Sequence, residues 1–309
     1  AILHLLYSRF FMQALSYKND KFKIKEPFKG LFTQGMVCHE TYKDEKGNWV
    51  SPEEIISING ENFLKEDKTK KIKVGPSESM SKSKRNTIDP ERIISSYGAD
   101  SVRLFILSDS PPEKDVQWSE EGISASYKFL QKLWNLNTKI IEEINKDHPQ
   151  NSHIELIKFT NKFVKKMETN LNNFSYNIII ASLHEMQNFF SKEIGKGYSQ
   201  KILKQNYEKI LITMIPIIPH FSNECLEMIN KNNKKVWPEY DEELTKEDLN
   251  LIVVQINGKK RGLIEAKQSM DEDALNKLIF ADEKITKYLE NKEIKKKIYI
   301  KDKLINIII

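Results

Sequence analysis

Apolar residues recur at helical spacing from about residue 119 to residue 230, and beyond residue 250 their spacing becomes that of β-strands. This change of period constrains the fold more than any other feature of the 309 residues, because one element cannot follow both patterns. Several amphipathic helices joined by short links of Asn, Gly and Pro are typical of a helical bundle. The sequence therefore predicts a bundle that is followed by a separate domain containing strands.

Proline and capping signals mark the limits of the predicted bundle. Pro111-Pro112 interrupts the chain and predicts a domain boundary. Ser119, followed by two glutamates, is typical of a helix N-cap with an acidic first turn. We expect a linker from Trp237 to Asp248. The helical patterns behind the first long helix lie at about 153–171, 175–194, 198–215 and 220–230.

The segment after the linker predicts a compact α+β domain. Leu251–Ile256 and Arg261–Ala266 are short apolar runs separated by Asn257-Gly258, and Asn-Gly is the strongest short signal for a β-hairpin. Two short helices and two strands are expected to complete the domain, at about 271–279, 282–290, 295–300 and 303–309.

The first part of the chain mixes helix and strand patterns. Residues 3–15 carry apolar side chains at helical spacing and predict a buried helix, and Thr33–Cys38 predicts a strand. Residues 43–74 are rich in Lys, Glu and Asp, with turn signals such as Asn59-Gly60, so small surface hairpins are expected there. Two helices should follow, from Pro90 to about Tyr97 and from Asp100 to Ser108.

Composition bounds the class of protein. Hydrophobic residues make up 39% and charged residues 30%, and the net charge of +5 admits a nucleic-acid partner without requiring one. The two cysteines, Cys38 and Cys225, form no CxxC pair, which favours a reducing cytoplasm over a disulfide framework or a cysteine zinc site. No apolar run reaches the ~18–20 residues of a membrane span. The opening segment Ala1–Tyr7 lacks an initiator methionine and the basic start of a signal peptide, so we expect a fragment.

One loop carries the strongest chemical signal. Lysine, arginine and serine crowd the segment Ser77–Pro90, which is suited to meet a polyphosphate; the alternative is a solvated basic turn. Neither GxxxxGK[ST] nor GxGxxG occurs, so Walker and dinucleotide-binding motifs are absent from the sequence. Met80-Ser81-Lys82-Ser83 with Lys84 resembles the KMSKS loop of class I aminoacyl-tRNA synthetases, which binds ATP during amino-acid activation.

Further segments extend this resemblance to leucyl-tRNA synthetases of the bacterial type. Ala1–Phe11, Gln34–Val37, Tyr97–Asp100, Gln117–Gly122 and Val254–Gly262 are similar to parts of the C-terminal portion of that family. The fold class that the resemblance implies is α/β plus all-α plus α+β. It comprises the end of a Rossmann-like catalytic domain (1–110, with a small insertion at 45–73), a helical anticodon-binding domain (111–240) and a C-terminal tRNA-binding α+β domain (250–309).

The resemblance also implies residue roles. Lys82 would be the catalytic contact with ATP, with Met80, Ser81 and Ser83 completing the ATP-binding loop. Lys84 and Arg85 are expected near the tRNA acceptor stem or in solvent. Mg²⁺ is expected with ATP, and no metal site is expected in this chain. The family usually has lysine where this chain has Ser79, which weakens one contact of the loop.

Two readings of the function stay open. The first is the C-terminal part of leucine–tRNA ligase, which would bind ATP and tRNA(Leu). Leucine would be held by the half of the enzyme that carries the family's HIGH motif, the HIGH-bearing half, which this sequence does not contain. Truncation and a split enzyme with a partner chain both fit. The alternative is a non-catalytic tRNA-binding module derived from a synthetase. In either case Lys259, Lys260 and Arg261, beside the Asn-Gly turn, are candidate contacts with tRNA phosphates, the alternative being a solubilising hairpin.

Overall fold

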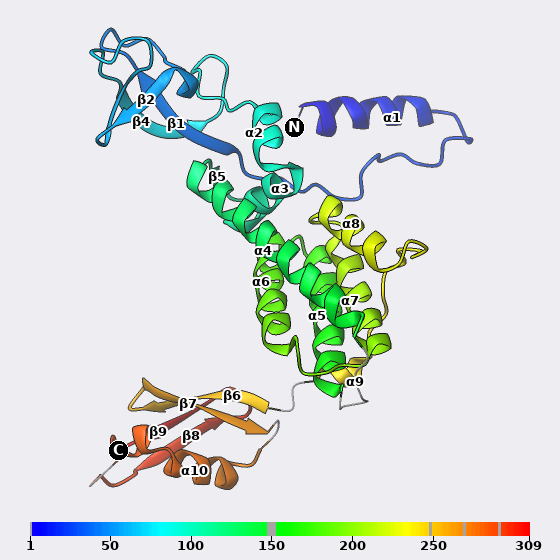
Figure 1. Cartoon of the computed structure of the whole chain (residues 1–309), viewed down its shortest axis with the longest axis vertical. Coiled ribbons are helices and arrows are strands. Elements are labelled where there is room, and N and C mark those ends of the chain that lie inside the picture. Colours follow the sequence, from blue (N-terminus) through cyan, green and yellow to red (C-terminus); the bar gives the residue numbers. More distant parts are fainter. Residues whose placement is uncertain (1, 147–152, 247–248, 268–269, 290–291) are drawn as a thin grey trace. The chain divides into compact units, whose positions relative to one another are not determined.

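The computed structural model describes residues 2–146, 153–246, 249–267, 270–289 and 292–309 (Figure 1). The chain divides into two compact units. One combines Ala1–Ser152 with Lys166–Pro238, and the other combines His153–Lys165 with Glu239–Ile309. The expected mixture of α/β, all-helical and α+β parts is confirmed, while the domain limits near residues 110 and 240 stay a prediction.

A three-stranded sheet lies in the first unit, with strand order β4-β1-β5. β1 (Val37–Lys43) pairs antiparallel with β4 (Lys73–Ser79) and parallel with the short β5 (Val116–Gln117). The predicted strand began at residue 33, but β1 begins only at Val37. The residues just before it bond to the segment that precedes β5: the N–H of Gly35 donates to the carbonyl of Pro112, and that of Met36 donates to the carboxylate of Asp115.

The charged segment between β1 and β4 forms small hairpins, as predicted. A turn closes between Asp44 and Asn48, and the helical turn η2 (Pro52–Glu54) leads into β2 (Ile55–Ile58). β2 pairs with β3 (Glu61–Leu64) across Asn59-Gly60. Both turn residues have positive φ, +52° and +84°, which is what a tight two-residue hairpin turn requires.

Two helices connect the sheet to the bundle. They are α2 (Pro90–Tyr97) and α3 (Ala99–Ser108), close to the predicted limits. The buried carboxylate of Asp100 accepts the backbone N–H of Phe221 at 2.7 Å, at the start of α8. Arg103 donates to the carbonyls of Ile217 and Pro216 just before that helix. α3 is therefore bound to the bundle by polar contacts as well as by packing.

The helical bundle is confirmed. Its helices are α4 (Glu120–Ile144), α5 (Ile154–Asn172), α6 (Tyr176–Glu193), α7 (Gln200–Met214) and α8 (Pro219–Ile229). Ser119 caps α4 as predicted, because its side chain accepts the N–H of Gly122. Inside the first unit, the fully buried Tyr207 of α7 donates its hydroxyl proton to Asn137 of α4 at 3.1 Å. α5 is shared, since its first part belongs to the second unit.

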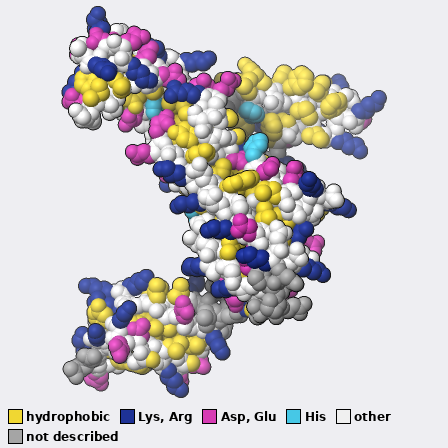
Figure 2. All heavy atoms as spheres, viewed as in Figure 1, with side chains coloured by type: hydrophobic (Ala, Val, Ile, Leu, Met, Phe, Trp, Pro, Cys, Tyr) yellow, Lys and Arg dark blue, Asp and Glu magenta, His cyan; other side chains and the backbone are white. Residues whose placement is uncertain are grey.

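The first helix was predicted correctly as a helix and wrongly as buried. A π-helical stretch (Ile2–Tyr7) continues into α1 (Ser8–Ser16), and none of their residues is buried. Phe10 is 74% exposed and Leu3 67% exposed, and Figure 2 shows apolar side chains gathered over this helix. The spacing fixed a helix with one apolar face, but no described residue of the chain covers that face. Burial depends on a partner surface, which spacing alone does not reveal.

The second unit contains a four-stranded sheet with order β7-β6-β9-β8. β6 (Leu249–Ile256) and β7 (Lys259–Lys267) form the predicted Asn-Gly hairpin, and β9 (Leu304–Ile308) lies parallel to β6 and antiparallel to β8 (Lys296–Ile300). Helices α10 (Glu272–Ala281) and α11 (Glu283–Thr286) pack on one face through buried apolar residues.

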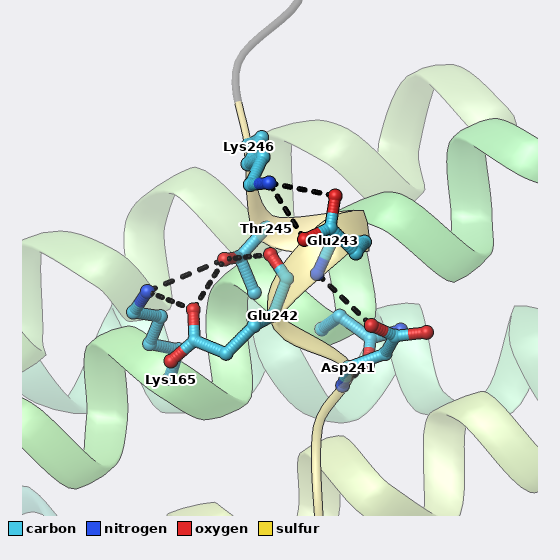
Figure 3. A network of polar contacts seen from close by, with 7 residues as sticks. Lys165, Asp241, Glu242, Glu243, Thr245 and Lys246 are labelled. Atoms are coloured by element: carbon cyan, nitrogen blue, oxygen red, sulfur yellow. Dashed lines mark hydrogen bonds and ion pairs between the residues drawn. The ribbon is translucent and has the colours of Figure 1, made fainter.

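The predicted linker contains a short helix. α9 (Glu242–Thr245) is capped by Asp241, whose backbone N–H donates to Asn161 of α5 at 2.7 Å. Lys165 of α5 donates to Glu242 at 2.5 Å, as Figure 3 shows. Residues 239–246 are thus bound to α5 rather than extended, and residues 247 and 248 of the predicted linker lie outside the described residues.

Candidate nucleotide-binding loop

The loop that carries Lys82 is fixed at both ends by regular structure. On one side β4 pairs with β1 as far as Ser79, opposite Cys38, and the N–H of Met80 adds a bond to the carbonyl of Val37 at 3.1 Å. On the other side α2 begins at Pro90, and Asp89 caps it by accepting the N–H of Glu91. The proline at the first helical position and the aspartate before it explain why the helix begins there.

Asn86 holds the base of the loop. Its side chain is fully buried, its amide nitrogen donates to the carbonyls of His39 and Glu78 at 3.2 Å each, and its amide oxygen accepts the N–H of Ser81 at 2.9 Å. His39 lies on β1 opposite Glu78 on β4. One amide therefore ties the loop to both strands.

A tight turn presents the basic residues. The N–H of Arg85 donates to the carbonyl of Lys82, and Arg85 has a φ of +54°. The Ser81 hydroxyl accepts the N–H of Lys84 at 3.3 Å and lies 3.2 Å from the hydroxyl of Ser83. Serine hydroxyls stabilise such turns by bonding to nearby backbone groups. The predicted ATP-binding residues Met80, Ser81, Lys82 and Ser83 are thus brought together on one turn.

The three cations of the turn differ in their partners. Lys84 forms an ion pair with Glu78, and Arg85 forms one with Glu54 at 2.7 Å. Lys82 is exposed, and among the described residues no hydrogen bond or ion pair engages its ammonium group. The turn therefore presents one cation that a bound anion could engage without first breaking an existing contact.

Two titratable groups around the loop, Glu54 and His39, have shifted pKa values. Burial alone would raise the pKa of the Glu54 carboxyl, but hydrogen bonds from the N–H of Ser51 and from Arg85, with the Arg85 charge, hold that pKa below its ordinary value. Burial lowers the pKa of His39, so its imidazole is favoured as the neutral form. Glu54 is thus a persistent anion beside Arg85, whereas His39 adds no positive charge at neutral pH.

Ser79, which stands where the resemblance led us to expect lysine, is exposed at the end of β4. Its side chain is therefore not needed for packing, and a longer side chain could occupy the position.

The described residues contain no group of three or more His, Cys, Asp and Glu side chains that could hold a metal ion. No helix in the described part of the chain is long and apolar enough to cross a membrane.

Two family models match the chain. Residues 72–119, which include the loop, match the model of class I tRNA synthetases for isoleucine, leucine, methionine and valine. Residues 153–279 match the model of the anticodon-binding domain of tRNA ligases. The second match covers most of the bundle and continues into the second unit.

Curated relatives of the chain are leucine–tRNA ligases. Leucine–tRNA ligases of Zymomonas mobilis, Rickettsia massiliae and Bartonella quintana are 40%, 38% and 39% identical to this chain, and each match covers 100% of it. The chain is a relative of bacterial leucyl-tRNA synthetases. It resembles their C-terminal portion and spans only 36–37% of the length of these relatives.

A solved structure agrees with this relationship at the level of fold. The leucyl-tRNA synthetase of Agrobacterium radiobacter K84, solved as a ternary complex with tRNA and LeuAMS, has a TM-score of 0.68 with 22% identity. The match covers 99% of this chain and 36% of that synthetase. At this identity the likeness shows a shared fold.

The second candidate site of this synthetase relative lies on β7. Lys259 and Lys260 are exposed beside the turn Asn257-Gly258. Arg261 is also exposed, but its guanidinium lies 4.3 Å from the centre of the Tyr288 ring and so already has a contact within the domain. The two lysines are therefore the side chains most available to a phosphate, and their role in binding tRNA stays a prediction.

Sequence reasoning included Asn86 only as part of the loop motif and assigned it no contact. The ion-pair partners Glu54 and Glu78 were missed as well. The signal that the sequence offered was an asparagine at the end of a turn, because asparagine side chains bond to nearby backbone groups. The pairing of Arg85 with Glu54 joins residues 31 apart and leaves no local sequence signal.

Proposed function

We propose that this chain supplies the ATP-binding loop and the tRNA-binding domains of a leucine–tRNA ligase. The observation that carries the proposal is the exposed, unengaged ammonium of Lys82 on a turn whose base is fixed by Asn86. This turn lies in the segment that matches class I synthetases, and the relatives that match the whole chain are leucine–tRNA ligases.

In the proposed reaction, the leucine carboxylate attacks the α-phosphate of ATP and pyrophosphate leaves. Negative charge accumulates on the β- and γ-phosphate oxygens as the bond breaks. A lysine aimed at those oxygens stabilises the transition state more than the ground state, and only such a difference raises the rate. Lys82 has this role in the proposal, while the hydroxyls and N–H groups of the turn bind the remaining oxygens.

The other loop cations have a different place in the proposal. Lys84 and Arg85 already neutralise Glu78 and Glu54, so their engagement with ATP would cost an existing ion pair. They contribute to the shape and potential of the turn, and a tRNA acceptor stem could meet the exposed side of Arg85. Mg²⁺ would enter with ATP, bound by its phosphates. Leucine would be held by the HIGH-bearing part of the enzyme.

The tRNA-binding part of the proposal rests on the match of residues 153–279 to an anticodon-binding domain. The bundle would carry the anticodon contacts, and the exposed Lys259 and Lys260 would meet backbone phosphates. Phosphate contacts made by lysine supply affinity without reading sequence. Specificity for tRNA(Leu) is therefore assigned to the assembled enzyme rather than to these two side chains.

Leucine-dependent exchange between ATP and pyrophosphate tests the proposal. The chain is assayed alone and mixed with the HIGH-bearing half of a related enzyme, each with the wild-type residue and with Lys82→Ala. Exchange in the mixture that is lost with Lys82→Ala is the expected result. If folded, associated pieces give no exchange, or if Lys82→Ala exchanges normally, the ATP-binding role is wrong.

A second candidate function is a non-catalytic tRNA-binding module. The observation that favours it is the extent of the anticodon-domain match, 153–279, beside the shorter class I match, 72–119. Binding of tRNA by a chain that supports no exchange would select this function. An intact Met80–Ser83 turn with an unengaged lysine is the feature that a pure RNA-binding module does not require.

A further inference from the structure

We infer that Asn86 is a positioning residue for the ATP-binding loop: it sets the conformation in which Lys82 is presented, without touching ATP itself. The inference rests on the proposed function for its catalytic consequence, while its structural part concerns the loop alone. Asn86 is fully buried, so a nucleotide bound at the exposed turn could reach it only indirectly.

The hydrogen bonds of Asn86 require an amide. The site offers two carbonyl acceptors, from His39 and Glu78, and one N–H donor, from Ser81. Only a side chain with a two-proton donor and an adjacent acceptor satisfies all three. An ionised carboxylate would face the two carbonyls with no proton, and an alanine would remove all three contacts, leaving the N–H of Ser81 without this acceptor.

Hydrogen bonds connect Asn86 to the turn that carries Lys82. Asn86 fixes the N–H of Ser81, and the hydroxyl of Ser81 in turn accepts the N–H of Lys84. Lys82 lies between these two bonded residues, in the turn closed by its own carbonyl and Arg85. The position of the unengaged cation is therefore determined by a sequence of contacts that begins at the buried amide.

A loop fixed in this way needs less ordering when it binds its ligand. Fixing the backbone of a residue costs conformational entropy, so a turn that is already formed avoids that cost for each residue held. Loss of the amide should consequently loosen Ser81–Arg85 first. It should leave the β1–β4 ladder, which has its own backbone hydrogen bonds, largely in place.

The test compares Asn86→Asp and Asn86→Ala with Asn137→Asp. Asn137 is also fully buried and amide-bonded, but it lies in the bundle, so its variant controls for lost stability alone. The first measurement is trypsin cleavage of the chain after Lys82, Lys84 and Arg85, relative to cleavage after Lys46 in the exposed Asp44–Asn48 turn. The second is ATP–pyrophosphate exchange in the mixture with a HIGH-bearing half.

We expect trypsin to cleave the loop of the Asn86 variants about tenfold faster than that of the wild type, with both rates taken relative to cleavage after Lys46. This is the effect that the loss of one well-formed hydrogen bond predicts. In the exchange assay kcat/KM for ATP should fall about tenfold with the KM for leucine unchanged, again on the scale of one such bond. Asn137→Asp should change neither ratio. A ratio of loop cleavage to Lys46 cleavage that stays at the wild-type value in both Asn86 variants, or an equal rise of that ratio in Asn137→Asp, overturns the inference.

The two failures are separable. If Lys82→Ala leaves exchange unchanged, the proposed ATP role is wrong, and the cleavage ratio still decides whether Asn86 shapes the loop. If Lys82→Ala abolishes exchange while Asn86→Asp and Asn86→Ala leave both kcat/KM for ATP and the cleavage ratio at wild-type values, the proposed function stands and the positioning role of Asn86 is wrong.

Discussion

The guanidinium of Arg85 lies 2.7 Å from the carboxylate of Glu54 and also donates to the backbone carbonyl of Trp49. A cation of the loop is thereby bound to the hairpin segment between β1 and β4. Since Lys84 is similarly paired with Glu78, the described part of the turn leaves only the charge of Lys82 without a protein partner. Because Lys84 and Arg85 are paired and Lys82 is not, replacing Lys82 should reduce the exchange rate more than replacing either of the other two.

Replacing Lys82 with alanine should reduce the rate of leucine-dependent ATP–pyrophosphate exchange by roughly 10²–10³, the scale of one preorganised electrostatic donor. Lys84→Ala is the matched control, because its ammonium is already paired with Glu78 and should contribute less than tenfold, in keeping with the small worth of a partly exposed ion pair. Equal losses in the two variants would contradict the assignment of Lys82 as the principal contact.

Ser79→Lys should lower the KM for ATP in the same assay. Ser79 is exposed at the end of β4, so the longer side chain meets no packing penalty and adds a cation next to the turn. A gain of about threefold to tenfold is expected from one added charge-assisted contact with phosphate. Ser79→Gln, similar in reach but uncharged, is the control, and an equal gain with glutamine would point to a cause other than charge.

Replacing Lys259 and Lys260 by alanine should weaken tRNA binding. The slope of log K against log salt should become shallower by about one unit for each tRNA phosphate that the variant no longer binds. Arg261→Ala should change the slope less, because the guanidinium already lies over Tyr288. Filter binding or fluorescence titration at several salt concentrations measures both slopes. A slope that the double variant does not change would favour a solubilising hairpin.

The contact between α9 and α5 should loosen in acid. The hydrogen bond from Lys165 holds the pKa of Glu242 below its ordinary value, although slight burial acts the other way. A carboxyl whose folded pKa is depressed contributes stability above its unfolded pKa, and this contribution is lost as pH falls through the folded pKa. NMR shifts of Thr245 should therefore report release as the pH falls below about 4.3, the ordinary pKa of glutamate.

Glu242→Gln should remove most of that pH dependence. Glu243→Gln is the control, since Glu243 pairs with Lys246 within the same short segment rather than with α5. If both variants retained the wild-type titration of Thr245, the Lys165–Glu242 contact would not be what holds α9.

Tyr207→Phe should lower the free energy of unfolding by about 1–3 kcal/mol, because the oxygen of Asn137 would be left buried without its donor. Urea denaturation followed by helical circular dichroism measures this difference. Tyr42→Phe is the control: its hydroxyl donates to the exposed Glu40, whose carboxylate water can solvate, so the change should stay within about 0.5 kcal/mol.

The bundle and the tail could be predicted from sequence because their signals are local. Ser119 and Asn257-Gly258 specify a cap and a turn through their own backbone contacts, and the structure has both. Exposure of the first helix could not be predicted, because it depends on what covers Phe10 rather than on the spacing of apolar residues. The bonds of Asn86 to His39, 47 residues away, are equally invisible before the strands are paired.

The parallel pairing of β6 with β9 has a consequence for biosynthesis. β9 (Leu304–Ile308) lies between β6 and β8 in the sheet, yet it is translated after both of them. Until those residues leave the ribosome, the nascent β6–β7 hairpin has an unpaired inner edge and β8 has no neighbour. Open strand edges invite pairing with other chains. The interval before β9 emerges is thus when the nascent second unit is most exposed to aggregation, and when a ribosome-associated chaperone would protect it best.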